Sequence, residues 1–369
     1  MKNKKIAIVH DWLYAAGGAE VVLAKLLQMF PKADIYTMVD LLPKKHRDFL
    51  EGHQIYTSIL QKYSFVAKNH KYFIPIMPYL VEQFDLSQYD LIISDSHFVA
   101  KGVITAPKQL HIAYIYSPVR YGWDMYFDYD KAGAFGKGLK NLFMKRWLHK
   151  LRIWDFVSAQ RADFLISSSK FIQKRVKKYW GRDSTLVYPA IEIDDTIYCE
   201  KKQEYFVTLS RLIEYKKIDI MIEAFNELPQ KKLIIIGEGR MKEKLQKISK
   251  SNITFTGYLP KNEAMEIVSK AKAFIFMAKE DFGIVPIEAQ ACGTPVIAYA
   301  DGGAEETILK DKTGVFIEKQ DKESLKEAIL NFKIENFSPS VCREFAKNFS
   351  SFNFEKQLTT ILKGITNEI

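Results

Sequence analysis

Short apolar runs alternate with helical patterns along nearly the whole chain. The first run, residues 5–12, is rich in β-branched side chains, and residues 17–30 then place apolar side chains at helical spacing. Further apolar runs that predict buried strands occupy residues 33–39, 90–96, 111–117, 163–169 and 184–190. Strands that are separated by helices are typical of βαβ units, so the pattern predicts a parallel sheet.

This alternation stops in a polar, irregular stretch at residues 190–203 and then begins again. New strands are predicted at residues 205–210, 232–237, 253–259, 273–278, 294–300 and 314–318, and helices at 218–228, 240–250 and 354–365. The pattern therefore predicts two doubly wound α/β domains that join near residue 195. Such sheets bind ligands at the carboxyl ends of their strands, so we expect the binding site in the cleft between the domains.

The composition fits a globular protein of about two domains. The chain has 369 residues, of which 47% are hydrophobic and 27% are charged. The apolar run near the N-terminus is too short for a signal peptide, and no stretch is long enough to span a membrane. The three cysteines show no metal-binding spacing and make a poor disulfide framework, so we expect a reducing cytoplasm.

The net charge of +10 is concentrated in one segment. Residues 137–182 carry thirteen lysines and arginines but only two acids, Asp155 and Asp163. The segment is either a solvated helix face, a nucleic-acid surface or a contact with an anionic membrane. Aromatic and apolar side chains interleave with the cations, as in an interfacial helix, and no nucleic-acid-binding motif is present. We therefore favour the membrane over nucleic acid, which places the protein in the cytoplasm, at the inner face of the membrane.

Two glycine-containing turns follow predicted strands. Gly17 and Gly18 precede the first helix, where backbone N–H groups and the helix dipole favour an anion, although a plain tight turn explains them as well. The stretch IIIGEGR at residues 234–240 resembles a dinucleotide fingerprint only superficially. Its third glycine is missing, and Glu238 stands where a phosphate would approach, which argues against a nicotinamide-dependent dehydrogenase.

A basic pair leaves the first strand of the second half. Arg211 and Lys216 lie five residues apart in the loop after that strand. A guanidinium and an ammonium group at this position suit a diphosphate, the first through bidentate hydrogen bonds and the second as a point charge. By themselves the two residues are equally compatible with a solvated surface.

The stretch EDFGIVPIEAQACGTPVIAY, residues 280–299, places two carboxylates around a turn into a helix. Pro286 suits the first turn of that helix, and the backbone N–H groups of Phe282, Gly283 and Ile284 would face an anion at its N-terminus. Glu280 and Glu288 beside an anion are unfavourable unless they accept hydrogen bonds from hydroxyl groups. A sugar nucleotide supplies both the anion and the hydroxyls. The simpler alternatives are a solvated loop for Glu280 and a dipole complement for Glu288.

These residues resemble glycosyltransferase family 4, the retaining enzymes with the GT-B fold. Glu280 and Glu288 match the family's E-x7-E motif, and SRLIEYKKIDIMIEAF resembles its donor-diphosphate segment, although Lys217 stands where glycine is common. FTGYLP, ACGTPVIAYADGGAEETI and TGVF resemble other parts of the donor domain. HDWLYAAGGAEVVLAKLLQMFPKADIYT and SPVRYGWDMYFDY are similar to a subgroup that contains bacterial O-antigen mannosyltransferases.

The resemblance implies residues 1–195 as a Rossmann-like acceptor-binding domain and residues 196–369 as a Rossmann-like nucleotide-sugar domain, with the last helix packing back on the first. It implies retaining transfer of a hexose, mannose from GDP-mannose above all, to a glycan or lipid-linked acceptor in bacterial O-antigen or capsule synthesis. No cofactor and no metal are implied. Asp194 and Asp195 are interpreted as a solvated part of the linker and not as metal ligands.

The resemblance also implies roles for individual residues. Arg211 and Lys216 stabilise the leaving diphosphate, and Glu280 holds the donor sugar, so these three are the catalytic candidates. Glu288 holds the ribose. The donor-binding residues implied are Gly17, Gly18, Gly237, Gly257, Tyr258, Leu259, Phe282, Gly283, Ile284 and Glu288.

One departure from the family concerns the donor sugar. Family members often carry a histidine after the strand HIAYIY, where this chain has Tyr116. Tyr116 then points into the cleft, or His97 or Arg120 takes the role. Residues 120–124, RYGWD, are expected to face the acceptor.

Other interpretations stay open. One is a UDP-hexose-dependent enzyme of the same fold, and another is a non-catalytic sugar-nucleotide-binding subunit. A glycoside hydrolase would flank the scissile bond with two carboxylates, whereas Glu280 and Glu288 are better explained as hydroxyl binders.

For the transferase, we expect a front-face transfer in which the departing phosphate oxygen takes the acceptor proton.

Overall fold

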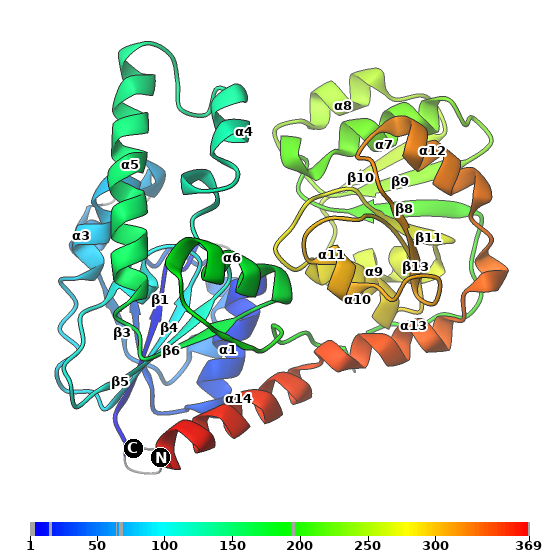
Figure 1. The fold of residues 1–369 in the computed structure, drawn as a ribbon. Helices are drawn as coiled ribbons and strands as arrows, with labels where there is room; N and C mark the ends of the chain where they lie inside the picture. Colours follow the sequence, from blue (N-terminus) through cyan, green and yellow to red (C-terminus); the bar gives the residue numbers. More distant parts are fainter. Residues whose placement is uncertain (1–3, 15–16, 64, 66–68, 194–195, 368–369) are drawn as a thin grey trace. The chain divides into compact units, whose positions relative to one another are not determined.

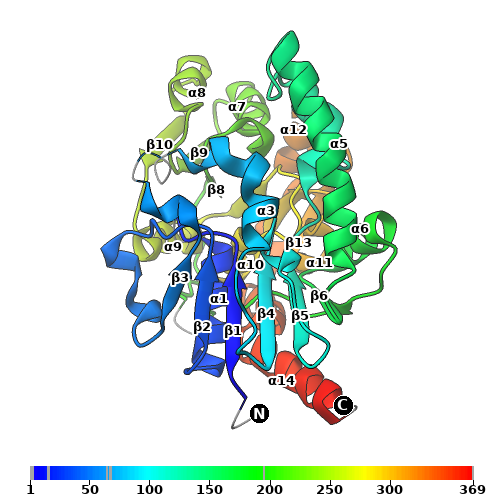
Figure 2. The ribbon, with the colours of Figure 1, turned by 90° about the vertical axis from the view of Figure 1, so that its left-hand side faces the viewer.

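The computed structural model describes residues 4–14, 17–63, 65, 69–193 and 196–367 (Figures 1 and 2). The chain divides into two compact units, residues 1–189 and 190–369, which we call the N-terminal and C-terminal domains and describe separately. The two aspartates of the predicted linker, Asp194 and Asp195, lie outside the described residues.

The N-terminal domain is built on a parallel sheet of seven strands in the order β3-β2-β1-β4-β5-β6-β7. Its strands are β1 (Ile6–His10), β2 (Asp34–Thr37), β3 (Ile55–Thr57), β4 (Leu91–Ser96), β5 (Leu110–Ile115), β6 (Phe164–Ser167) and β7 (Thr185–Leu186). Its helices are α1 (Gly18–Met29), α3 (Met77–Val81), α4 (Tyr126–Lys131), α5 (Leu139–Ala159) and α6 (Lys170–Trp180).

The central strands are apolar on both faces because helices cover both faces of the sheet. Every residue of β1, β4 and β5 is buried, so these strands show apolar runs without a regular alternation, and buried polar residues such as His10 and Asp95 lie at the carboxyl ends of β1 and β4. Helix α1 buries Val22, Leu23, Leu26 and Leu27. Helix α5 contributes Leu148 and Leu151 to a core that also contains Ile92 of β4.

The C-terminal domain contains a second parallel sheet, of six strands in the order β10-β9-β8-β11-β12-β13. Its strands are β8 (Tyr205–Leu209), β9 (Lys232–Ile236), β10 (Ile253–Gly257), β11 (Ala273–Phe276), β12 (Val296–Tyr299) and β13 (Gly314–Ile317). Its helices are α7 (Ile218–Asn226), α8 (Lys242–Ile248), α9 (Lys261–Lys270), α10 (Ile284–Ala291), α11 (Ala304–Thr307), α12 (Lys322–Asn331), α13 (Pro339–Ala346) and α14 (Ser351–Asn367).

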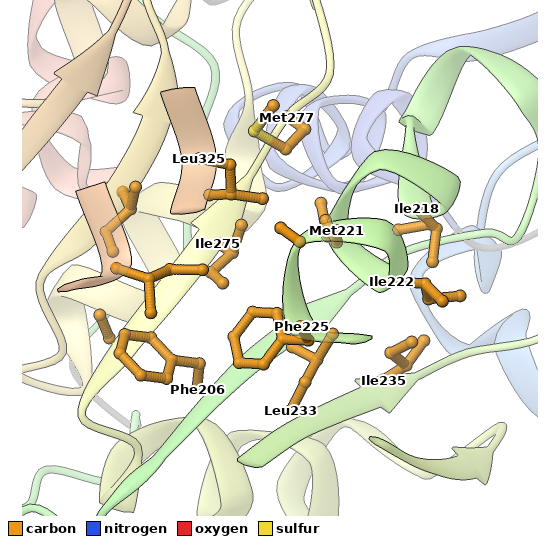
Figure 3. Packing of buried hydrophobic residues seen from close by; sticks show 14 of the residues in the cluster. Phe206, Ile218, Met221, Ile222, Phe225, Leu233, Ile235, Ile275, Met277 and Leu325 are labelled. Atoms are coloured by element: carbon orange, nitrogen blue, oxygen red, sulfur yellow. The ribbon is translucent and has the colours of Figure 1, made fainter. Parts of the chain in front are cut away.

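Two apolar clusters cover the two faces of this sheet. Figure 3 shows the first, where Met221 and Phe225 of α7 and Leu325 of α12 pack on Phe206 and Ile275 of the sheet. The second joins α9 and α10 to the opposite face; its members include Val268 and Ala289. The C-terminal domain is therefore doubly wound, as the alternating pattern predicts.

All the strands predicted from apolar runs are confirmed, as are the helices predicted at residues 17–30, 218–228, 240–250 and 354–365. Strand β3 was not predicted, because it is a three-residue edge strand whose Tyr56 is 42% exposed, and half-exposed edge strands carry little apolar pattern. The packing of α14 against the other domain stays a prediction.

Candidate functional site

The predicted donor residues gather where two neighbouring strands of the C-terminal sheet end. Strands β8 and β11 lie side by side in the sheet, although two strands, β9 and β10, come between them in the sequence. The loop after β8 carries Arg211 and Lys216, and the loop after β11 carries Glu280. Such a change of strand order opens a crevice at the carboxyl edge, where ligands bind in doubly wound sheets.

Lys216 forms an ion pair with Glu280 across this point. The two side chains are only 12% and 19% exposed, and the Lys216 ammonium group lies 5.3 Å from the centre of the Tyr215 ring. Arg211 is exposed, and its Nη2 donates to the Tyr215 hydroxyl at 3.4 Å. The structure thus brings the three predicted catalytic candidates to one edge of one domain.

Lys217, the departure from the family pattern, has a strained backbone. Its φ angle is 56°, in the left-handed region that glycine adopts freely, and it stands directly before helix α7. The turn that positions Lys216 therefore requires a conformation that a lysine adopts only at a cost.

Close backbone packing shapes the loop from Glu280 to Gly283. A Cβ atom on Gly303 would lie 2.3 Å from the Cα atom of Phe282, so only glycine allows the two segments to approach. Gly283 has a φ angle of 88° and precedes α10, and Pro286 lies in the first turn of that helix, as predicted. The amides of residues 282–284 thus lie at a helix N-terminus, which favours an anion.

Glu288 lies one turn inside α10 and forms an ion pair with Lys261. The two atoms, Lys261 Nζ and Glu288 Oε1, are 2.8 Å apart, and the Glu288 side chain is 14% exposed. Sequence analysis missed Lys261, the first residue of α9, although it directly follows the FTGYLP stretch. Both site carboxylates therefore have a lysine partner.

The remaining predicted donor residues lie at the ends of β9 and β10. Gly237 needs glycine, because a Cβ atom there would lie 2.0 Å from the Ser210 carbonyl oxygen, and at Gly257 it would lie 2.8 Å from Glu238 Oε1. Glu238 pairs with Lys242 at 2.6 Å. The Glu238 carboxylate would repel a phosphate at the GEGR turn, as expected from the sequence. Tyr258 is 68% exposed and Leu259 is partly buried.

In the N-terminal domain, Asp11 organises the loop after β4. Its carboxylate accepts backbone N–H hydrogen bonds from residues 97–100 at 2.6–2.8 Å. His97 Nδ1 also lies 3.0 Å from Asp11 Oδ2, and the His97 ring packs edge-on against Trp12. Burial opposes ionisation of Asp11, but His97 and the backbone N–H groups hold its pKa well below the usual range. His97 is thus held by a structural carboxylate while remaining 32% exposed.

Tyr116 points toward the N-terminus of α1. Its hydroxyl donates to the Ala19 carbonyl at 3.4 Å, and burial raises its pKa well above the ordinary value. Gly17, extended and exposed, is the N-cap of α1, and Gly18 is its first residue. Tyr116, Gly17 and Gly18 therefore lie at one edge of the N-terminal sheet.

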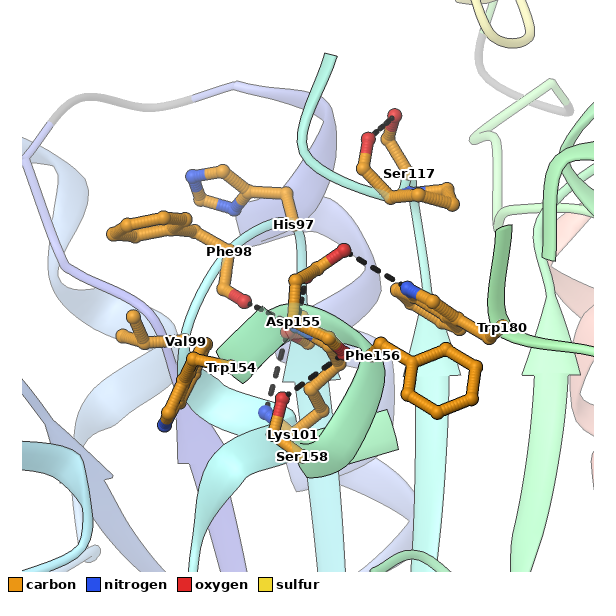
Figure 4. A network of polar contacts seen from close by, with 12 residues as sticks. His97, Phe98, Val99, Lys101, Ser117, Trp154, Asp155, Phe156, Ser158 and Trp180 are labelled. Atoms are coloured by element: carbon orange, nitrogen blue, oxygen red, sulfur yellow. Dashed lines mark hydrogen bonds and ion pairs between the residues drawn. The ribbon is translucent and has the colours of Figure 1, made fainter. Parts of the chain in front are cut away.

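A buried ion pair between Lys101 and Asp155 is linked to the segment that is expected to face the acceptor, and Figure 4 shows the pair together with Trp180. Lys101 Nζ lies 2.7 Å from Asp155 Oδ1, and both side chains are at most 2% exposed. Asp155 Oδ2 accepts from the indoles of Trp123 and Trp180, at 2.7 and 2.8 Å. Through Trp123, helix α5 thus fixes the stretch 120–124, whose Arg120 is half-buried.

Asp124 adds a second anchor to this stretch, accepting from Arg175 Nη2 at 2.5 Å. Sequence analysis missed both anchors. The available signal was Asp155 itself, an acid within a basic amphipathic helix.

Within the described residues, no group of three or more His, Cys, Asp or Glu side chains is arranged to hold a metal ion. In the same part of the chain, no helix has the length and apolar character needed to cross a bilayer.

Comparison with known proteins finds similarity to glycosyltransferases, mainly in the C-terminal domain. Residues 192–349 match the family model of the glycosyl transferases group 1. An uncharacterised glycosyltransferase of Methanocaldococcus jannaschii is 25% identical over 221 residues, which cover 58% of this chain and 61% of that protein. A GDP-mannose-dependent phosphatidylinositol monomannoside mannosyltransferase of Corynebacterium glutamicum is 34% identical over 136 residues, 33% of this chain and 35% of that protein.

The matches span about three fifths or less of these curated relatives. Similar solved structures cover nearly the whole chain. HepE of Anabaena, crystallised with UDP, has a TM-score of 0.71 at 15% identity, covering 98% of this chain and all of that one. Sucrose-phosphate synthase of Thermosynechococcus elongatus has a TM-score of 0.72 at 16% identity, covering 99% and 100%. The predicted GT-B fold is confirmed, and the matches support a group 1 glycosyltransferase.

Proposed function

We propose that the protein is a retaining, metal-independent hexosyltransferase that moves mannose from GDP-mannose to a hydroxyl of a glycan or lipid-linked acceptor. The pathway we propose is the synthesis of a bacterial surface polysaccharide such as O-antigen or capsule. The observation that carries the proposal is the ion pair of Lys216 with Glu280 just before the N-terminus of α10, with Arg211 in the same loop as Lys216. GDP-mannose is favoured because several matched relatives are named as GDP-mannose-dependent.

The chemistry follows from charge development at the anomeric carbon. The bond from that carbon to the diphosphate oxygen breaks, and a bond to the acceptor oxygen forms on the same face. The departing phosphate oxygen takes the acceptor proton. Arg211, Lys216 and the amides of residues 282–284 stabilise the negative charge that grows on the diphosphate, and preorganised donors of this kind often supply the largest catalytic effect.

The carboxylates bind hydroxyl groups in this proposal. Glu280 holds the hexose, and Glu288 holds the ribose once Lys261 moves aside. The ion pairs with Lys216 and Lys261 offset the charge of both acids, which limits repulsion of an approaching diphosphate. Gly17 and Gly18 would add backbone N–H groups to the diphosphate, and His97, Tyr116 and Arg120 would line the sugar or acceptor.

Two experiments test the donor and the reaction. The first is incubation with a panel of sugar nucleotides and lipid-linked or synthetic glycan acceptors, followed by mass spectrometry of the products. The second is thermal unfolding with GDP, UDP and a short oligonucleotide. Stabilisation by GDP alone supports the GDP-mannose proposal, and stabilisation by the oligonucleotide contradicts it.

A UDP-hexose donor is the second candidate, and one observation favours it: HepE was crystallised with UDP and with UDP-glucose. Stabilisation by UDP alone, with transfer from a UDP-hexose, would select it. Nucleotide binding without turnover on any acceptor would instead indicate a non-catalytic subunit.

We also propose that α5 contacts an anionic membrane at the cytoplasmic face. The solvent-facing side of this helix carries apolar and basic side chains at helical spacing, namely Leu139, Leu142, Phe143, Arg146, Lys150, Ile153 and Val157. Leu139 is 85% exposed, Leu142 is 65% exposed and Phe143 is 64% exposed. Apolar side chains that water surrounds, mixed with cations, suit the interface of an anionic bilayer.

Vesicle sedimentation tests this contact. The full chain should sediment with phosphatidylglycerol vesicles and stay in solution with phosphatidylcholine vesicles. Leu142→Asp with Phe143→Asp should abolish sedimentation, whereas Phe352→Asp, at an exposed position of α14, should not. Equal sedimentation of all variants would contradict the role of α5.

A further inference from the structure

A histidine and two carboxylates that have no role in the proposed donor site meet at the carboxyl edge of the N-terminal sheet. His10 ends β1, Asp95 lies opposite it in β4, and Glu20 lies in the first turn of α1. β1 and β4 are neighbours although β2 and β3 intervene in sequence. The three side chains therefore mark the crevice of this sheet where ligands bind in doubly wound folds.

His10 is held from one side only. Its Nδ1 lies 2.8 Å from Asp95 Oδ2, and both side chains are fully buried. Its Nε2 lies 3.9 Å from Glu20 Oε1, which is too long for a hydrogen bond, and among the described residues this nitrogen has no hydrogen-bond partner. Glu20 is 13% exposed, so a buried unpaired nitrogen faces a carboxylate that solvent reaches.

The protonation of His10 decides what fits between these groups. Burial lowers its pKa, but the hydrogen bond to Asp95 and the nearby Glu20 outweigh burial and raise the pKa to about 10. His10 Nε2 thus carries a proton at neutral pH and is a hydrogen-bond donor. A hydroxyl group accepts from Nε2 and donates to the Glu20 carboxylate at the same time.

The spacing also suits a hydroxyl oxygen. His10 Nε2 and Glu20 Oε1 lie 3.9 Å apart. One oxygen atom placed about 2.8 Å from each would form both hydrogen bonds, with an angle of about 90° at that oxygen. We propose that His10 and Glu20 form a subsite that binds a sugar hydroxyl of the acceptor glycan. Asp95 is a positioning residue, because its hydrogen bond to Nδ1 directs the Nε2 proton toward Glu20.

This inference rests on the proposed function, since it assigns the acceptor to the N-terminal domain. A structural role for Glu20 is the competing explanation. Glu20 is the third residue of α1, and its Oε2 lies 3.1 Å from where a Cβ atom on Gly17 would be, as in a capping box. Because glutamine serves in a capping box as glutamate does, Glu20→Gln separates the two roles.

The test follows the imidazole of His10 directly in the full chain. The chain has seven histidines, so 15N-histidine labelling gives few signals, and His10→Gln identifies the signal of His10. Methyl α-mannoside and methyl β-glucoside are the probes. We expect a saturable shift of the Nε2 signal with at least one hexoside, its loss in Glu20→Gln, and its retention in Glu51→Gln, an exposed glutamate of the same domain.

A kinetic measurement on the same variants completes the test. With the acceptor that the product panel identifies, Glu20→Gln should raise the acceptor KM about tenfold and leave stabilisation by the nucleoside diphosphate unchanged. The proposal is overturned if the His10 Nε2 signal does not shift with either hexoside. It is also overturned if Glu20→Gln binds the hexosides and the acceptor as the unmodified protein does. Failure of the proposed function is a different result: no donor gives turnover in the product panel. That result does not depend on the outcome of the hexoside titration.

Discussion

Lys216 and Glu280 form an ion pair across the loops that follow β8 and β11, two strands that are neighbours in the sheet but distant in sequence. The pair joins the cation proposed for the leaving diphosphate to the carboxylate proposed for the donor sugar. Binding of a sugar nucleotide would exchange this internal contact for two contacts with the ligand.

Replacement of Lys216 by alanine should lower kcat by about 10²–10³-fold, because a charge aimed at the developing phosphate charge is lost. The fold should persist, since Lys216 lies in the segment after β8 and outside both apolar clusters of the domain. Product formation by mass spectrometry measures the rate, and Lys270→Ala, on the surface of α9, is the matched control. Turnover equal to that of the unmodified protein would remove the role given to Lys216.

Glu288→Gln should weaken the recognition of ribose hydroxyls. The unmodified protein should prefer a nucleoside diphosphate over its 2′-deoxy form by about tenfold, the value of one good hydrogen bond to a charged group. The variant should lose most of this preference. Calorimetric titration of both nucleotides gives the ratio, with Glu266→Gln as the control. An unchanged ratio would place the ribose elsewhere.

Asp155→Asn should destabilise the N-terminal domain by about 3–5 kcal/mol, because Lys101 keeps its buried charge without a partner. The double change with Lys101→Met should cost less than the sum of the two single changes. Urea unfolding followed by tryptophan fluorescence is suitable, since Trp123 and Trp180 donate to Asp155. Additive costs would show that the pair does not act as a unit.

Lys217→Gly should leave the protein as stable as before or raise its free energy of unfolding by about 1 kcal/mol. Glycine adopts the φ angle of 56° without the cost that a lysine bears, and this gain exceeds the extra entropy of glycine in the unfolded chain. Thermal unfolding compares the two proteins. Gly283→Ala provides the opposite case, because its φ angle of 88° should make the alanine variant less stable.

The free energy of unfolding should depend on the ionisation of His111. Burial, together with the charges of Arg182 and Arg161, lowers its pKa to about 3, whereas an unfolded histidine has a pKa of about 6.5. Between these values the unfolded chain binds the additional proton, so stability falls as pH decreases from about 6.5 toward 3. The contribution is fully present above pH 6.5. In His111→Asn, urea unfolding measured across this range should show a weaker pH dependence.

The sequence by itself determined every strand except β3, several of the helices and the plan of two α/β domains, and the GT-B fold was expected from the resemblance to a known family. It could do so because strands buried on both faces appear as continuous apolar runs, and helices between them repeat every three to four residues. It also singled out Arg211, Lys216, Glu280 and Glu288, since cations and acids beside a glycine-containing turn into a helix are chemically unusual.

Tertiary structure alone decided which of these groups touch. The pairing of Glu288 with Lys261 and of Asp155 with Lys101, and the meeting of His10, Asp95 and Glu20, join residues from separate elements. Strand order brings such residues together, and strand order follows from how helices pack on the two faces of a sheet. That packing leaves no local pattern in the sequence, so these contacts became visible only in three dimensions.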